Sequence, residues 1–400
     1  MSRTVIGLSI SSGLEGVDAA AVRADGIGLE LTPTLAASVR VAFPPTVRDT
    51  IRAASPGSPL PHLPEFVRNV ADTAIHAARQ VLTRAGISPR DTFAAAFLDP
   101  TRPFAELTSA LPEIADRVAE QTGLTVIHGL RHRDRAAGGS GQLITAAADY
   151  LIFRHQEKPR LVIHLGSAAS LFFVLPGSKV SSVVGFEAAP GNQLLDALLY
   201  HGTRGKETID AGGKKAVQGR CLEPLLNRWL EHPHITRIPP KSVHAEAFGR
   251  SFLLAAFDAA RQLGAGLPDL LCTATHLVAK VLGEAARAWL PSGSARQIFA
   301  TGGGVRNGFL WQLVSQQFAG EVVSRSEEAG VPALARNAAG AAVLAMLATD
   351  GVAGNLPLLT GATGNRLLGH FTPGDGRNWA KVAAWVADQT GEYPRTNRAA

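Results

Sequence analysis

The fold is decided by residues 161–200, which read LVIHLGSAASLFFVLPGSKVSSVVGFEAAPGNQLLDALLY. Apolar, β-branched runs flank a Pro-Gly-Ser turn and lead through a Gly-rich corner into a segment with apolar residues at helical spacing. This pattern predicts a strand, a hairpin, a second strand and a helix.

The corner at residues 185–192 places one carboxylate, Glu187, at the end of a strand and just before a helix. Two interpretations follow from this position. Backbone amides at the helix start can face an anion, with Glu187 as a base beside it. Alternatively, Glu187 lies in the first helical turn and complements the macrodipole.

Composition indicates an ordinary globular protein of two or three domains, since the 400 residues are 46% hydrophobic and 18% charged. No apolar run reaches the roughly 20 residues that span a bilayer, and the first residues form a strand-like pattern without a signal-peptide layout. We therefore expect a cytoplasmic protein with no membrane partner. Cys221 and Cys272 lack neighbours at metal-ligand spacing, which favours two buried thiols over a zinc site or a disulfide.

Charge gives little support to nucleic-acid binding. The formal charge is +6 and the isoelectric point is near 9.6, but the basic residues are scattered. The densest run, residues 131–135, contains an acid and no aromatic residue. This pattern favours a solvated surface or a local site for a small phosphorylated ligand over a nucleic-acid partner.

The N-terminal segment, residues 4–24, reads as two strands joined by a turn of small residues at positions 11–13. Small side chains allow phosphate oxygens to approach backbone N–H groups. A plain β-hairpin turn has the same composition, so both interpretations stay open.

Strands and helices alternate along the rest of the chain, which is typical of an α/β fold. The helical periodicities fall at residues 64–86, 106–122, 223–230, 245–263, 267–290, 333–348 and 379–389. The strand-like runs fall at residues 93–97, 125–128, 297–300 and 322–323, and residues 232–241 read as a Pro-rich loop. The strand at 297–300 runs into three glycines, Gly302 to Gly304, and then a helix, which indicates either a nucleotide-binding loop or a tight structural turn.

A series of short motifs recurs in order between residue 5 and about residue 375. They are Ile6-Gly7-Leu8, Leu14, Gly16-Val17-Asp18-Ala19-Ala20, Arg131 with Asp134, Ala137-Gly138-Gly139, Gly141, Gly185-Phe186, Pro190-Gly191-Asn192, Leu195-Asp196-Ala197, Pro240-Lys241-Ser242, Gly302-Gly303-Gly304, Arg306-Asn307, Gly354-Asn355-Leu356-Pro357, Thr360-Gly361-Ala362, Leu368-Gly369 and Pro373-Gly374. In this order the motifs resemble the anhydro-N-acetylmuramic acid kinase family.

The resemblance implies the fold of the actin, sugar-kinase and Hsp70 superfamily: two ribonuclease-H-like α/β lobes with ATP and Mg²⁺ in the cleft between them. We expect an N-terminal lobe at residues 1–128, joined by a C-terminal helix at 376–392, and a second lobe at residues 129–375. The family also implies a homodimer that binds a small amino sugar and ATP.

The implied reaction combines hydrolysis with phosphoryl transfer. A carboxylate base activates water against the anomeric carbon of 1,6-anhydro-N-acetylmuramic acid, and the freed 6-oxygen takes the γ-phosphoryl group of ATP, a step in peptidoglycan recycling. By this resemblance Glu187 is the catalytic base. The implied nucleotide-binding residues are Ser11, Ser12, Gly13, Leu14, Glu15, Gly16, Val17, Asp18, Gly302, Gly303, Gly304 and Asn307. The implied substrate-binding residues are Arg131, Asp134 and Asn337, and either Asp18 or Glu15 is a candidate ligand for Mg²⁺.

The sequence departs from the family pattern at several of these positions. The departures are Glu187 in place of Asp, Ala188-Ala189 in place of Thr-Gly, Ile10 to Glu15 in the phosphate hairpin, Phe97 to Arg102, Gly166 to Ser170, Asn337 in place of Glu, and Ala245 in place of Arg. Three interpretations remain: an active sugar kinase with a Glu base, a pseudokinase or binding protein that kept the fold, and a kinase for a different sugar. The β-branched Ile10 would favour the second if its side chain crowded the phosphates.

Overall fold

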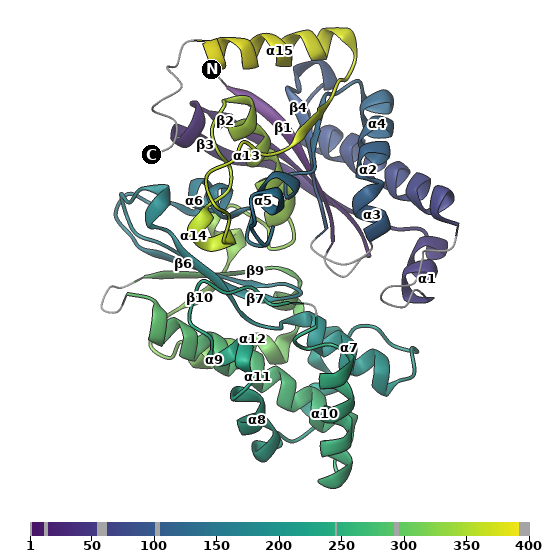
Figure 1. Cartoon of the computed structure of the whole chain (residues 1–400), viewed down its shortest axis with the longest axis vertical. Coiled ribbons are helices and arrows are strands. Elements are labelled where there is room, and N and C mark those ends of the chain that lie inside the picture. Colours follow the sequence, from purple (N-terminus) through teal and green to yellow (C-terminus); the bar gives the residue numbers. More distant parts are fainter. Residues whose placement is uncertain are drawn as a thin grey trace. The chain divides into compact units, whose positions relative to one another are not determined.

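The computed structural model describes residues 2–11, 15–53, 62–100, 105–244, 246–291 and 296–391. The chain divides into two compact units, and the first contains residues 1–152 and 330–400 while the second contains residues 153–329 (Figure 1). The C-terminal helix α15 (Gly376–Gly391) belongs to the first unit.

The observed division differs from the expected boundaries in one respect. Residues 129–152 and 330–375 group with the first unit and not with the second. The physical reason is the helix α13 (Arg336–Thr349), which packs against the sheet of the first unit. Sequence order alone does not reveal this return of the chain.

The first unit is built on a sheet with the strand order β11-β5-β4-β1-β2-β3. Its strands are β1 (Arg3–Ile10), β2 (Gly16–Asp25), β3 (Thr32–Ala42), β4 (Ala94–Leu98), β5 (Val126–His128) and β11 (His370–Thr372). Strands β1, β2 and β3 are antiparallel neighbours, whereas β4 is parallel to β1 and β5 is parallel to β4. Strand β11 adds to the edge in antiparallel orientation.

The second unit repeats this arrangement with the order β10-β9-β6-β7-β8. Its strands are β6 (Arg160–Leu165), β7 (Ala169–Val174), β8 (Val184–Ala189), β9 (Gln297–Thr301) and β10 (Val323–Arg325). The strands β6, β7 and β8 are antiparallel neighbours, β9 is parallel to β6, and β10 is parallel to β9. Each unit therefore has the ribonuclease-H-like order of strands, and the expected fold class is confirmed.

Helices cover both faces of the first sheet. The helices α2 (Leu63–Ala85) and α4 (Leu111–Thr122) pack on one face, where Ile6 and Leu8 join the core. Because side chains alternate along a strand, Gly7 points to the opposite face, which α13 covers. A Cβ atom at Gly7 would overlap the Ala338 carbonyl, so glycine permits the close approach of this Ala-rich helix.

In the second unit, the long helix α11 (Leu267–Trp289) packs against β7, β8 and the neighbouring helices. These neighbours are α7 (Asn192–Gly202), α8 (Glu223–Leu230), α10 (Arg250–Gln262) and α12 (Gly308–Gln317). Cys272 is buried within α11, as expected, but Cys221 is only half-buried. Burial raises the pKa of both thiols. Among the described residues, no helix has the length and apolar character needed to cross a bilayer.

Several elements differ from the expectations. The helix expected at 106–122 is divided into α3 (Ala105–Ser109) and α4, since Pro112 lies in the first turn of α4. The Pro-rich loop contains the short helix α9 (Pro233–Thr236), and α10 starts later than expected. The remaining helices are α1 (Pro45–Ala53), α5 (His132–Ala136), α6 (Ala146–Phe153) and α14 (Pro357–Thr360). Strands β3 and β11 and helix α1 were not expected from the sequence.

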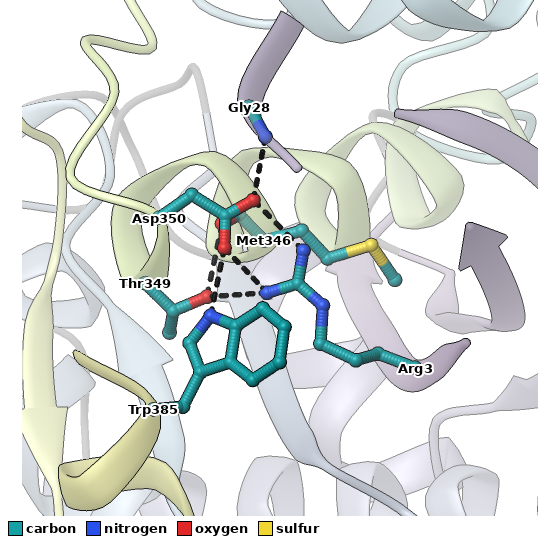
Figure 2. A network of polar contacts seen from close by, with 6 residues as sticks. All are labelled: Arg3, Gly28, Met346, Thr349, Asp350 and Trp385. Carbon is teal, nitrogen blue, oxygen red and sulfur yellow. Dashed lines mark hydrogen bonds and ion pairs between the residues drawn. The ribbon is translucent and has the colours of Figure 1, made fainter. Parts of the chain in front are cut away.

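A polar network joins four segments of the first unit that lie far apart in sequence (Figure 2). The Asp350 carboxylate accepts hydrogen bonds from Arg3 at 2.5 and 2.8 Å, from the Gly28 backbone N–H at 2.7 Å and from the Trp385 indole at 2.8 Å. The Arg3 guanidinium also lies 4.2 Å from the centre of the Trp385 ring. This network attaches α15 to the end of α13 and to the start of β1.

Candidate functional site

In the first unit, the candidate phosphate hairpin connects β1 to β2. The Ser11 hydroxyl accepts hydrogen bonds from the backbone N–H groups of Glu15 and Gly16 at 2.9 and 3.2 Å, and the Ser11 N–H donates to the Gly16 carbonyl at 2.9 Å. Ser11 therefore closes the turn. Ser12, Gly13 and Leu14, which were expected at the phosphates, lie outside the described residues.

The side chain of Ile10 does not face this turn. Ile10 is 3% exposed and belongs to the hydrophobic core formed with α2 and α4. Val17, its partner across the hairpin, is also fully buried. The concern that a β-branched side chain at position 10 crowds a phosphate is therefore removed.

The two candidate Mg²⁺ ligands differ in their surroundings. Asp18 forms a bidentate ion pair with Arg40, at 2.5 and 2.7 Å, and is largely buried. Glu15 is exposed at the mouth of the hairpin. Arg40 therefore engages both oxygens of Asp18, and its charge also interacts with that of Glu15. Among the described residues, no three His, Cys, Asp or Glu side chains could together hold a metal ion.

Asp134, expected to bind substrate, is fully buried in α5 and organises the surrounding loops. Its carboxylate accepts hydrogen bonds from Gly141 N–H at 2.9 Å, Asn355 Nδ2 at 2.9 Å and Thr360 Oγ1 at 2.7 Å. A Cβ atom at Gly139 would overlap this carboxylate. These contacts explain the sequence motifs around Asn355 and Thr360 as partners of one carboxylate.

Arg131 is also buried, just before α5. Its Nε atom donates to the Asp99 carbonyl at 3.0 Å, and Nη1 donates to the Gly141 carbonyl. The Asp99 carboxylate in turn accepts from the Leu130 and Arg131 backbone N–H groups at 2.9 and 3.3 Å. Arg131 and Asp134 thus hold the same Gly141 loop from two sides.

Asn337, the third expected substrate residue, is the second residue of α13 and is half-buried. Its Oδ1 atom accepts a hydrogen bond from Arg336 at 3.3 Å. Arg336 also forms a buried ion pair with Asp149. Burial raises the pKa of Asp149, although the positive charge of Arg336 opposes this effect.

In the second unit, Glu187 lies within β8 and not in a helical turn, so the interpretation that it complements a macrodipole is wrong. The side chain is 8% exposed, and its Oε2 atom accepts a hydrogen bond from the Val243 N–H at 2.6 Å. The Glu187 N–H donates to the Lys241 carbonyl at 3.1 Å, and the Glu187 carbonyl contacts His234 Nε2 at 3.2 Å. A loop distant in sequence therefore fixes this residue, and the sequence pattern alone did not predict that.

Two ionisable groups of that loop have strongly shifted pKa values. Burial lowers the pKa of His234 to about 4, and the nearby Lys241 charge adds to the effect. Burial also lowers the pKa of Lys241 to about 8, with a contribution from Arg237. At neutral pH, His234 is therefore uncharged and Lys241 is mostly charged.

The first backbone N–H groups of α7 already have acceptors, which argues against the interpretation that they face an anion. The Asn192 and Gln193 N–H groups donate to the Gly166 and Ser167 carbonyls at 2.9 and 3.1 Å, and Leu194 donates to Gly191. The corner after Glu187 therefore binds the β6–β7 turn.

The triple-glycine segment after β9 lies against the same turn. Cβ atoms at Gly302 and Gly304 would lie 2.7 Å from Leu165 atoms, and Gly302 has a φ of 91°, so both glycines are explained by packing. Gly303 differs, because it is exposed and its Cβ would have no neighbour closer than 3.8 Å. The absent side chain at Gly303 therefore leaves the backbone exposed.

Asn307 caps the helix that follows. Its Oδ1 atom accepts a hydrogen bond from Leu310 N–H at 3.0 Å, and a Cβ atom at Gly213 would overlap it. The Asn307 side chain thus explains why α12 starts here. It also lies against Gly213, and the sequence alone did not predict that the turn at Gly212-Gly213 lies near the triple-glycine segment.

Comparison with known proteins places these features in a family. The model of the family "Anhydro-N-acetylmuramic acid kinase" matches residues 3–374. Proteins of that name from Acaryochloris marina and Cyanothece sp. are 31% and 32% identical, and the alignments cover 92% of this chain in each case and 99% and 98% of those proteins. A third, from Chromobacterium violaceum, is 31% identical over 93% of this chain and its own full length. The chain belongs to the anhydro-N-acetylmuramic acid kinase family.

Proposed function

We propose that this protein is an ATP-dependent kinase that hydrolytically opens 1,6-anhydro-N-acetylmuramic acid and phosphorylates its 6-oxygen. The observation that carries the proposal is the Glu187 carboxylate, which is largely buried and oriented by a backbone N–H in a chain that matches the family almost from end to end.

In the proposed reaction, Glu187 accepts a proton from water as the water oxygen bonds to the anomeric carbon. The bond between that carbon and the 6-oxygen breaks and leaves its electron pair on the 6-oxygen. The 6-oxygen then bonds to the γ-phosphorus of ATP as the bond from that phosphorus to the β,γ-bridging oxygen breaks, and ADP leaves. A carboxylate fixed by a hydrogen bond at 2.6 Å keeps its orientation toward the water, which favours this proton transfer.

The family resemblance supplies the candidate ATP-binding residues of each unit. The exposed backbone at Gly303 suits a nucleotide, because no side chain covers it. The family resemblance assigns the phosphates to the hairpin that begins at Ser11. Mg²⁺ usually binds through one or two carboxylates together with substrate phosphates, and Glu15 would supply the carboxylate here. Bound Mg²⁺ would neutralise charge that develops on the phosphoryl group.

The family resemblance also supports three further parts of the proposal: a homodimer, a cytoplasmic location and a role in peptidoglycan recycling. The departures from the family pattern were the reason to consider a pseudokinase. One of them, Ile10, has its side chain in the core and does not oppose activity.

The test replaces Glu187 by Gln and by Asp and measures sugar phosphorylation and ATP affinity. Glu187→Gln removes the base with little change in size, and we expect turnover to fall by a factor on the order of 100 to 10,000 with ATP affinity unchanged. Glu187→Asp restores the family's usual residue and should retain more activity than Glu187→Gln. Equal activity of the wild type and Glu187→Gln would exclude Glu187 from the mechanism.

A further inference from the structure

The loop between α8 and α10 folds back onto β8 and bonds to Glu187 at three points. Val243 N–H donates to the Glu187 carboxylate at 2.6 Å, and the Lys241 carbonyl accepts from the Glu187 N–H at 3.1 Å. His234 Nε2 lies 3.2 Å from the Glu187 carbonyl, and because a carbonyl only accepts, His234 carries its proton on Nε2. This loop thus contacts both the backbone and the carboxylate of Glu187, which also pairs with Ser170 of β7.

Lys241 closes this loop on itself. Its Nζ atom donates to the His234 and Ile235 carbonyls at 3.1 and 2.8 Å. The two ends of the segment from His234 to Val243 are therefore held together, with one end on the Glu187 carbonyl and the other on its carboxylate. The ring centre of Phe186, the neighbour of Glu187 in β8, lies 6.0 Å from Nζ.

The environment of Lys241 is unusual for a lysine. Lys241 is only 4% exposed, and within the part of the chain that the structure describes its Nζ atom forms no ion pair. A buried ammonium group that bonds only to neutral carbonyls costs folding free energy. Neutral side chains could hold the loop from His234 to Val243 at a lower cost in folding free energy. The cost of burying Lys241 therefore indicates that the shape of this loop serves a function.

We propose that Lys241 and His234 are positioning residues that hold the Val243 N–H on the Glu187 carboxylate and so fix the orientation of the catalytic base. This inference rests on the proposed function, in which Glu187 activates water. It also accounts for Glu at this position, because its additional side-chain torsion, compared with Asp, is restrained by the Val243 hydrogen bond.

The experiment compares Lys241→Met with wild type, with Lys241→Arg as the conservative variant and with Lys179→Met as the matched control. Lys179 is exposed and lies in the chain between β7 and β8. Methionine keeps an unbranched apolar side chain beside Phe186 but cannot donate to the carbonyls. Steady-state kinetics are measured across pH, and circular dichroism checks that each variant is folded.

We expect Lys241→Met to lower kcat by about tenfold to a hundredfold, since displacement of a reacting group by about 1 Å has effects of that order. The KM for ATP should stay unchanged. The acid limb of the pH profile should move up by about one pH unit, because the carboxylate loses a hydrogen bond that favours its charged form. Lys241→Arg should recover part of kcat, and Lys179→Met should equal wild type.

A wild-type kcat and pH profile in Lys241→Met would overturn the inference. If wild type itself does not phosphorylate the sugar, the proposed function fails separately, and a second measurement still decides the role of Lys241. The protein is labelled with ¹³C at glutamate carboxyl carbons, and the Glu187 signal is assigned with Glu187→Gln. Its titration midpoint should move to higher pH in Lys241→Met, whereas an unchanged midpoint contradicts the positioning role.

Discussion

The buried Asp350 network of Figure 2 makes a quantitative prediction about the first unit. Asp350→Ala removes the acceptor of four hydrogen bonds: two from Arg3, one from Gly28 N–H and one from Trp385. The Arg3 side chain is only 4% exposed, so its charge would remain buried without a carboxylate partner. Removing one member of a buried pair costs about 3–5 kcal/mol of unfolding free energy.

For a folded unit of about this size, a loss of that order lowers the melting temperature by about 6–20 °C. The assay is thermal unfolding monitored by Trp fluorescence, which also reports on Trp385 in α15. The matched control is Asp258→Ala, because Asp258 pairs with Arg261 on the exposed surface of α10 and exposed pairs contribute roughly 0–1 kcal/mol. The double variant Arg3→Met/Asp350→Leu should regain at least about 1 kcal/mol of the loss, since no charge stays buried. The reasoning is refuted if Asp350→Ala and Asp258→Ala lower the melting temperature equally.

Two further predictions concern the second unit. Gly303→Ala should leave the melting temperature nearly unchanged, because the added Cβ would have no neighbour closer than 3.8 Å. The same variant should weaken ATP binding by about tenfold or more. Gly302→Ala, in contrast, should destabilise the fold by at least about 1 kcal/mol, because Gly302 has a φ of 91°. Calorimetric titration and thermal unfolding test both, and normal ATP affinity in Gly303→Ala would exclude this backbone from the nucleotide site. Burial lowers the pKa of His234 to about 4. Between about pH 4 and 6.5, the unfolded chain therefore binds more protons than the folded chain. The stability that His234 contributes is lost as the pH falls through this window. His234→Gln should therefore show a shallower loss of urea stability between pH 7 and pH 5 than wild type, and parallel slopes would contradict this.

Local patterns were sufficient to predict most of the fold. The β-branched runs of β6 and β7 and the periodicity of α8 and α11 are strong signals, and these elements lie where the sequence places them. Strand β3 is mostly half-exposed and its short alternation is weak, so it was missed. The return of α13 to the first unit depends on Gly7 and Ala338, which are too far apart in sequence for a local pattern to connect them.

The sequence predicted which residues belong to the candidate site, but not which of them contact one another. The sequence predicted the triple-glycine segment as a candidate site. Only the structure distinguishes Gly302 and Gly304, which pack against Leu165, from the exposed Gly303. Glu187 was found as the last carboxylate before a helix, but its hydrogen bond to Val243 spans 56 positions. Likewise, the motif residues Asn355 and Thr360 gained a physical explanation only when both were found to bond to Asp134.

The most direct test of the central claim is a reaction of the purified protein with 1,6-anhydro-N-acetylmuramic acid, ATP and Mg²⁺ in water enriched in ¹⁸O, followed by mass spectrometry of the sugar. The account predicts a product that has gained one phosphoryl group and one solvent oxygen, and that does not form with Glu187→Gln. An unchanged sugar, in a preparation that binds ATP, would contradict the account and identify the protein as a nucleotide-binding member of the family without this activity.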